Sequence, residues 1–145
     1  MCMNFAYSVW AALAFAAAPA AMVSAVEPAP EGAVQAARAT MQEAVKLLED
    51  LNSILNTVSG RATADAAAMP MIGNLTQYAS VIENLDVNVD VLDPAQQRAL
   101  EKDYEAQFYE LKSAVYEKIQ ALDAAGAYGS AALQSAISQY RQLYK

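Results

Sequence analysis

The stretch AVQAARATMQEAVKLLEDLNSILNTVSG, residues 33–60, decides the fold. Apolar side chains recur in it at spacings of three and four residues: Val34, Ala37, Met41, Ala44, Leu48, Leu51, Leu55 and Val58. That period places them along one side of an α-helix, with the polar residues mainly on the other side. Gly60 follows, and a glycine there can end a helix by adopting the left-handed conformation. We therefore predict a first long helix over residues 33–58.

A second helix is predicted to start at Thr63, whose side chain can cap it, with Asp65 favourably placed in the first turn. Its apolar side chains continue at helical spacing: Ala68, Ile72, Leu75, Ala79, Ile82 and Leu85. Pro70 and Gly73 interrupt this pattern. Because proline lacks an N–H and disfavours a helical residue before it, we expect a kink, or a helix that starts near residue 70.

A third helix is indicated by DPAQ, residues 93–96, where Asp93 caps, Pro94 takes the first position and Gln96 completes a capping box. Its apolar face is formed by Leu100, Tyr104, Phe108, Leu111, Val115, Ile119 and Leu122. The helix is predicted to run to about Asp123, which makes it roughly 45 Å long.

The segment AAGAYG, residues 124–129, breaks the third helix, and Ser130 then caps a short final helix. That helix carries Leu133, Ile137, Tyr140 and Tyr144 on one face. The short connection between the first two helices favours antiparallel neighbours. The predicted fold is all-α: an antiparallel up-down bundle of three long helices plus a short C-terminal helix, in one domain over residues 33–145. The alternative is a coiled-coil dimer through the first helix, which keeps a seven-residue repeat.

The stretch ENLDVNVDVLDP, residues 83–94, begins like a calcium-binding loop. Acidic and amide side chains alternate in it with valines: Asp86, Asn88 and Asp90. A calcium-binding loop requires glycine at its sixth position and glutamate at its twelfth, but this chain has Val91 and Gln97 there, so the calcium pattern fails. A strand would have no partner. We predict an extended connector of about eight residues with its polar side chains in water and its valines over the end of the bundle.

The N-terminus has the features of an export signal. Residues 1–26 carry no charged side chain, and Val23-Ser24-Ala25 fits the small-x-small pattern of a cleavage site before Val26. The first basic residue is Arg38, so the usual N-terminal positive charge is missing. We predict a signal peptide over 1–25 and an extended linker over 26–32, with export to the periplasm or secretion and no stable membrane insertion after cleavage. The alternative is an uncleaved membrane anchor.

Composition excludes several classes of function. The chain has a net charge of −7, and this negative charge repels phosphate backbones, so we predict no nucleic-acid partner. It has no histidine, and its single cysteine, Cys2, lies in the predicted signal. Haem, di-iron and zinc sites lack their usual ligands, and no catalytic, cofactor or metal residues are predicted. Glu101 and Glu105 share a helix face as ordinary surface carboxylates, and Asn74-Leu75-Thr76 is interpreted as a coincidental glycosylation sequon.

Tyrosine is enriched in the C-terminal third, and Tyr109, Tyr116 and Tyr128 are the candidate contact surface. Tyrosine suits contact surfaces, although packing at the edge of the core is the simpler alternative. We expect a non-enzymatic exported protein that acts through protein–protein contacts, by self-association or with a partner, or as a structural element of the envelope. The alternative is a helical bundle that holds a small apolar molecule.

Three features of the sequence carry a resemblance to known proteins: TADAAA at residues 63–68, the long predicted helix at 94–123, and Tyr128-Gly129-Ser130 followed by Leu133. On these features the chain resembles a loose group of short exported helical proteins of Gram-negative bacteria, over roughly residues 40–140. The resemblance implies a helical fold and an exported location, and it implies no activity.

Overall fold

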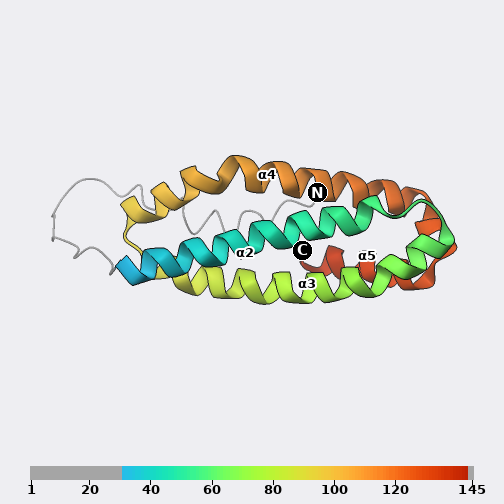
Figure 1. Cartoon of the computed structure of the whole chain (residues 1–145), viewed down its shortest axis with the longest axis horizontal. Coiled ribbons are helices and arrows are strands. Elements are labelled where there is room, and N and C mark those ends of the chain that lie inside the picture. Colours follow the sequence, from blue (N-terminus) through green and yellow to red (C-terminus); the bar gives the residue numbers. More distant parts are fainter. Residues whose placement is uncertain (1–30, 144–145) are drawn as a thin grey trace.

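The structure, a computed structural model, describes residues 31–143. Within them the chain forms four α-helices and one short 3-10 turn: α2 (Glu31–Asn56), α3 (Arg61–Asp90), α4 (Pro94–Ala124), η1 (Gly126–Gly129) and α5 (Ala131–Leu143). Successive long helices run antiparallel, so α2 and α4 point the same way, and α5 folds back along one half of the bundle (Figure 1). The predicted fold class is confirmed: an all-α up-down bundle of three long helices plus a short C-terminal helix.

The predicted signal peptide over 1–25 lies outside the described residues, as do residues 26–30 of the predicted linker and Tyr144. Residues 31 and 32 already belong to α2, so the first helix begins two residues earlier than predicted. None of the helices between residues 31 and 143 combines the length and the hydropathy that a membrane span requires.

The core consists of two clusters, one in each half of the bundle. In the half near the α3–α4 turn, which we call the three-helix half, α2, α3 and α4 surround residues that include Met41, Leu48, Leu85 and Phe108. In the other, four-helix half, α5 joins them: Leu51, Leu55, Met71, Leu75, Val115, Ile119, Leu133 and Ile137. Because α5 is short, it covers only part of the length of α3 and α4 (Figure 1).

The apolar face of α2 is buried inside this single chain. Six of its eight predicted positions are no more than 2% exposed: Ala37, Met41, Ala44, Leu48, Leu51 and Leu55. They pack against α3 and α4. The face that a coiled-coil dimer would offer to a second chain is therefore occupied within the bundle.

The turn between α2 and α3 differs from the prediction. Gly60 does not end α2 in a left-handed conformation; its φ of −179° is extended, and it is the residue before α3. The hydroxyl oxygen of Thr63 accepts hydrogen bonds from the N–H groups of Ser59 (2.9 Å) and Gly60 (3.0 Å). These bonds hold Gly60 at the start of α3, which begins at Arg61. Thr63 therefore lies inside the first turn of α3 and not before it, and Asp65 lies beyond that turn, contrary to the prediction.

Helix α3 continues through Pro70, so the predicted start near residue 70 is wrong. Proline removes the N–H that would bond the carbonyl of Ala66. Both Ala66 and Pro70 are exposed, so water can hydrate that carbonyl. On the opposite side Ala68 and Met71 are fully buried, and this packing holds the helix together across the proline.

The extended connector predicted within residues 83–94 is also wrong. Helix α3 runs to Asp90, and only residues 91–93 separate it from α4. Leu85, Val89 and Leu92 are buried at helical spacing, while Val87 and Val91 are 66% and 60% exposed. The helical period of the buried side chains therefore outweighs the local alternation of valines and acids.

The predicted start of α4 and the predicted cap of α5 are confirmed. The carboxylate of Asp93 accepts hydrogen bonds from the N–H groups of Ala95 (2.8 Å) and Gln96 (2.9 Å), and the Gln96 side chain accepts one from the N–H of Asp93 (3.1 Å). The Ser130 hydroxyl accepts the N–H of Leu133 at 3.1 Å. Between the two helices four consecutive residues have positive φ, from 50° to 75°: Gly126, Ala127, Tyr128 and Gly129. This left-handed turn reverses the chain and directs α5 back onto α3.

Candidate contact surface

The three tyrosines of the candidate surface are all solvent-exposed. The exposed fractions are 69% for Tyr109, 50% for Tyr116 and 41% for Tyr128. Tyr78 and Tyr140 are instead 5% exposed and belong to the core. Tyr104 is half-buried against the core, so the described tyrosines range from buried to exposed, and the three candidates are the exposed ones.

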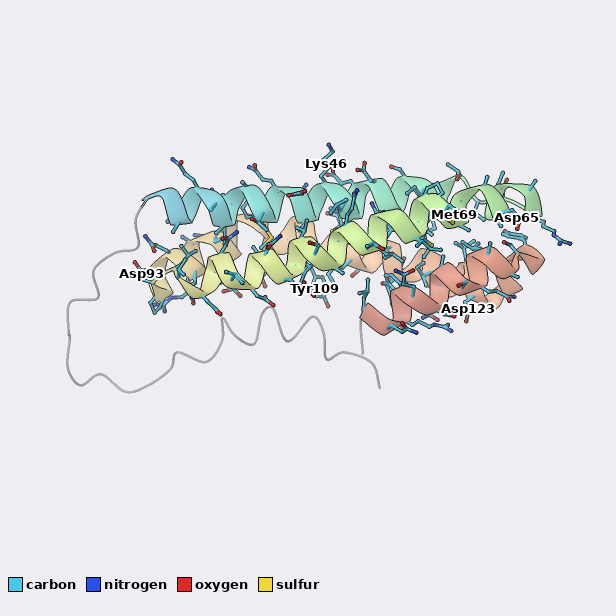
Figure 2. All side chains as sticks on the ribbon, turned by 90° about the horizontal axis from the view of Figure 1, so that it is seen from below. Lys46, Asp65, Met69, Asp93, Tyr109 and Asp123 are labelled. Carbon is cyan, nitrogen blue, oxygen red and sulfur yellow. The ribbon has the colours of Figure 1, made fainter. Side chains whose placement is uncertain are left out.

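The structure brings two of the three tyrosines together. Tyr109 and Tyr116 are seven residues apart in α4, two helical turns, so they share one side of the helix about 10 Å apart. The side chain of Tyr109 projects from the ribbon in Figure 2. Tyr128 lies in the left-handed turn η1 with a φ of 52°, so it does not belong to that side of α4. The contact surface on α4 is therefore formed by Tyr109 and Tyr116.

Interactions with the neighbouring helices locate this side of α4. On the side toward α2, Asp103 pairs with Arg38 at 2.6 Å, and Gln107 donates to the carboxylate of Glu49 at 3.3 Å. On the side toward α5, Asp123 pairs with Arg141 at 2.5 Å. Tyr116 and Tyr109 precede Asp123 by seven and fourteen residues. The two tyrosines therefore lie along the side of α4 that faces α5.

Three ionisable groups near this side have shifted pKa values. Burial lowers the pKa of Lys112 to about 8, and its Nζ lies 5.6 Å from the centre of the Phe108 ring. Burial, and then the neighbouring charge of Glu105, raise the pKa of Glu101. On α3, burial and then the charge of Asp90 raise the pKa of Asp86. Each of the two carboxylates thus stands beside a like charge one helical turn away.

These groups do not assemble a recognisable reaction centre. Lys112 is half-buried, whereas its neighbour Ser113 is exposed, because adjacent residues point to different sides of a helix. Among the described residues no group of three or more His, Cys, Asp or Glu side chains is placed to hold a metal ion. Asn74, the sequon residue, is only 8% exposed, and its amide donates to the main-chain oxygen of Leu47 at 3.0 Å.

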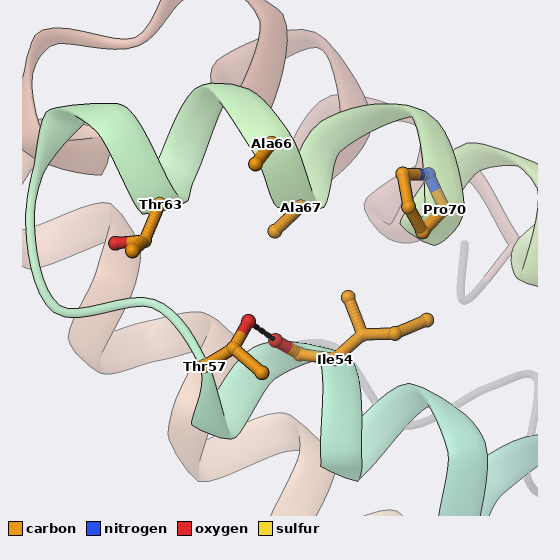
Figure 3. A pocket seen from close by; sticks show the side chains of 6 residues that line it. All are labelled: Ile54, Thr57, Thr63, Ala66, Ala67 and Pro70. Atoms are coloured by element: carbon orange, nitrogen blue, oxygen red, sulfur yellow. Dashed lines mark hydrogen bonds between the residues drawn. The ribbon is translucent and has the colours of Figure 1, made fainter.

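The structure also contains a hollow that sequence reasoning did not locate. It has a volume of about 350 Å³, lies where the end of α2 meets the start of α3 (Figure 3), and is lined by Ile54, Thr57, Thr63, Ala66, Ala67 and Pro70. The Thr57 hydroxyl donates to the oxygen of Ile54 (2.7 Å), and the Thr63 hydroxyl donates to that of Gly60 (2.9 Å). The hollow is therefore mainly aliphatic. Its sequence signal is the run of small residues before Pro70, which leaves a gap between two helices.

The chain matches no protein-family profile, no curated protein and no solved structure.

Proposed function

We propose that this chain is a small helical protein, exported to the periplasm or secreted, that acts through contacts with other protein chains and not by catalysis. In the envelope such contacts would give it a structural role. The observation that carries the proposal is the side of α4 with Tyr109 and Tyr116, two large amphipathic side chains that are at least half exposed. Exposed tyrosine is a favoured anchor of protein interfaces because it buries a large area at a small cost in side-chain entropy.

The chemistry of the described residues supports the non-enzymatic part of the proposal. They include no histidine and no cysteine. The general bases and nucleophiles of most hydrolases and transferases depend on those side chains. The pKa of the Lys112 amine is lowered, but this amine lies over the ring of Phe108, so it gives no support to a catalytic role.

Site-specific photo-crosslinking tests the contact role. A photo-reactive phenylalanine analogue is placed at Tyr109 or Tyr116, in cells that produce the protein naturally. The control position is Lys46, which is exposed on α2. We expect a discrete crosslinked protein band from positions 109 and 116 and none from position 46. Bands of equal intensity from all three positions, or none from any, would reject the proposal.

Mass spectrometry of the protein isolated from those cells tests the exported state. We expect a mature chain that begins at Val26. A chain that still carries Met1 would reject signal cleavage and leave the membrane-anchor alternative.

A second candidate function, binding of a small apolar molecule, is supported by the hollow between α2 and α3. Its volume falls at the lower end of the range for ligand pockets. Native mass spectrometry of the isolated protein would show an added mass that disappears in Ala66→Phe, which fills the hollow. Ala62→Phe is the control, because Ala62 is exposed one turn earlier on the same helix and does not line the hollow. A bound molecule on a monomer that lacks any crosslinked partner would favour this second function over the first.

A further inference from the structure

Helix α5 packs mainly on α3 and touches α4 at its edge, and two polar contacts mark the face that it occupies. Gln139 of α5 donates to the hydroxyl of Thr76 on α3 at 3.4 Å, and Arg141 of α5 pairs with Asp123 on α4 at 2.5 Å. Between these contacts the apolar side chains of α5 join the four-helix core: Leu133, Ala136, Ile137 and Tyr140. The face therefore accepts an apolar helix whose flanks carry polar and basic groups.

The same face continues beyond the end of α5 on both helices. On α3, Glu83 and Asp90 follow Thr76 at steps of seven residues. On α4, Tyr116 and Tyr109 precede Asp123 at the same steps. Seven residues are nearly two full turns, so these side chains stay on the side that α5 occupies further along. Within residues 31–143 no helix follows α5 onto this second part, because α5 ends at Leu143.

Carboxylates outnumber basic side chains on this second part of the face. The acidic side chains are Glu83, Asp86 and Asp90 from α3, and Glu101 and Glu105 from α4. The basic ones are fewer: Arg98, whose Nε donates to the oxygen of Pro94 at 3.0 Å, Lys102, and Lys112 over the Phe108 ring. Two of the acidic pairs, Asp86 with Asp90 and Glu101 with Glu105, are like charges at i and i+4, an arrangement that destabilises an isolated helix.

The charge of the face selects among occupants. A second copy of this chain carries the same net charge of −7, so its approach is opposed by repulsion. Nucleic acid and an anionic membrane are opposed for the same reason. A helix with basic side chains is attracted, and Arg141 beside Asp123 shows this arrangement within the chain itself.

We propose that the continuation of the α5-binding face, along α3 from Thr76 to Asp90 and along α4 from Tyr116 back to Glu101, which no helix within residues 31–143 covers, binds an amphipathic helix of a partner protein. The partner helix carries Arg or Lys beside its apolar stripe, and places those residues against Glu101, Glu105, Asp86 and Asp90 in the way that Arg141 meets Asp123. This inference rests on the proposed contact function and specifies the chemistry of the partner.

Fluorescence anisotropy with two designed peptides tests the proposal on the protein as isolated from its cells. One is a labelled helical peptide of about five turns with leucine on one face and lysine on its flanks; the other has glutamate in place of every lysine. We expect saturable binding of the lysine peptide that weakens as salt is raised, and no saturable binding of the glutamate peptide. Equal binding of both peptides, or binding of neither, would overturn the proposal.

Matched double variants locate the binding. Glu101→Gln with Glu105→Gln, and separately Asp86→Asn with Asp90→Asn, should each weaken binding of the lysine peptide by about fivefold or more. The control is Glu43→Gln with Asp50→Asn, which removes the same amount of charge from exposed positions of α2 and should change binding less than about twofold. Equal weakening by all three double variants would mean that net charge alone attracts the peptide, and would reject this face as the site.

The photo-crosslinking experiment separates the two levels of the proposal. A crosslinked partner at Tyr109 and Tyr116 together with no binding of the lysine peptide would retain the contact function and reject the basic helix. Absence of both would reject both.

Discussion

The side-chain amide of Asn74, in the middle of α3, donates a hydrogen bond of 3.0 Å to the main-chain oxygen of Leu47 in α2. This bond joins α2 and α3, the pair of helices with the most extensive contact in the bundle, at a buried position, since Asn74 is 8% exposed. The Oδ1 atom of the same side chain is buried, and no described residue donates to it. Of the hydrogen bonds that the Asn74 amide can form, the structure shows one donated bond and none accepted, at a buried position where an added charge would be costly.

Replacing this amide by a carboxylate should destabilise the protein strongly. In Asn74→Asp the donor is lost, and a negative charge is buried against the oxygen of Leu47. We expect the free energy of unfolding, measured with urea at neutral pH, to fall by about 3 kcal/mol or more. The control is Asn88→Asp: Asn88 lies two heptads further along α3 and donates to the Thr40 hydroxyl at 2.9 Å, but is only half-buried. The free energy of unfolding of Asn88→Asp should fall by about 1 kcal/mol. Equal losses of stability in the two variants would contradict the importance of burial at position 74.

The cap of α4 provides a second prediction. In Asp93→Ala the N–H groups of Ala95 and Gln96 lose their acceptor, so we expect the free energy of unfolding to fall by about 1 kcal/mol. Asp93→Asn keeps an oxygen acceptor at the same place and should cost less than half as much. Thermal and urea unfolding of both variants would measure the difference. A similar loss in both would assign the effect to charge and not to the cap.

Features that depend on a few neighbouring residues could be predicted from the sequence. Asp93, Pro94 and Gln96 form the expected cap because all of its bonds lie within four residues. The connector expected within residues 83–94 was wrong because its local alternation competes with a longer helical period that buries Val89. The preference of glycine for helix ends assigns Gly60 to the end of α2, whereas its extended φ of −179° and the Thr63 hydroxyl that accepts its N–H place it at the start of α3.

Features that depend on which helix lies opposite could be predicted only in part. The sequence pattern placed Ile72 and Ala79 in the core, yet both are half-buried, while Met71 and Tyr78 are buried. Helix α3 packs against α2 on one side and α5 on the other, so its buried face is wider than one stripe. The exposed tyrosines of α4 could be selected by residue type, but their relation to the end of α5 required the structure.

The left-handed turn before α5 gives a third prediction, in which one substitution has opposite effects at two glycines. A Cβ added at Gly129 or at Gly73 would meet no atom within 4 Å, so only the backbone decides. Gly129 has a φ of 75°, and Gly129→Ala should lower the free energy of unfolding by about 1 kcal/mol or more. Gly73 lies inside α3, and Gly73→Ala should raise the free energy by about 0.8 kcal/mol. Thermal unfolding of the two variants checks both signs, and a loss at position 73 would contradict the helical geometry of α3 there.

The calcium-like alternation in α3 gives a fourth prediction. Asn88 is directed toward Thr40 of α2, whereas Asp86 and Asp90 are exposed, so the three side chains do not converge on one point. We expect millimolar calcium to leave the melting temperature unchanged. The double variant Asp86→Ala with Asp90→Ala should fold, as measured by circular dichroism. A rise in melting temperature with calcium that disappears in the double variant would restore a metal site.

The raised pKa of Asp86 gives a fifth prediction, which concerns pH. Although Asp86 is exposed as a residue, partial burial of its carboxyl group and then the charge of Asp90 disfavour the ionised form in the folded state, so its folded pKa lies above the ordinary value of 3.8. Between the two values the folded chain binds more protons than the unfolded one, so the Asp86 contribution makes stability fall as pH rises through that window. Above the window the penalty is constant. Asp86→Asn should therefore stabilise the protein at neutral pH, by about 0.3 kcal/mol from the like-charge pair alone.

The gain should shrink as pH falls through the folded pKa of Asp86, and should vanish below 3.8, where the native carboxyl is protonated in both states. Urea unfolding of the protein and the variant across this range measures it. Asp50→Asn, at an exposed position of α2, is the control for the removal of one charge. A gain from Asp86→Asn that matches the control, or one that persists unchanged in acid, would show that Asp86 feels only the net charge of the chain. A gain that exceeds the control and disappears in acid would show that the uncovered face of α3 holds its carboxylates at a cost in stability, as a surface shaped for a cationic partner does.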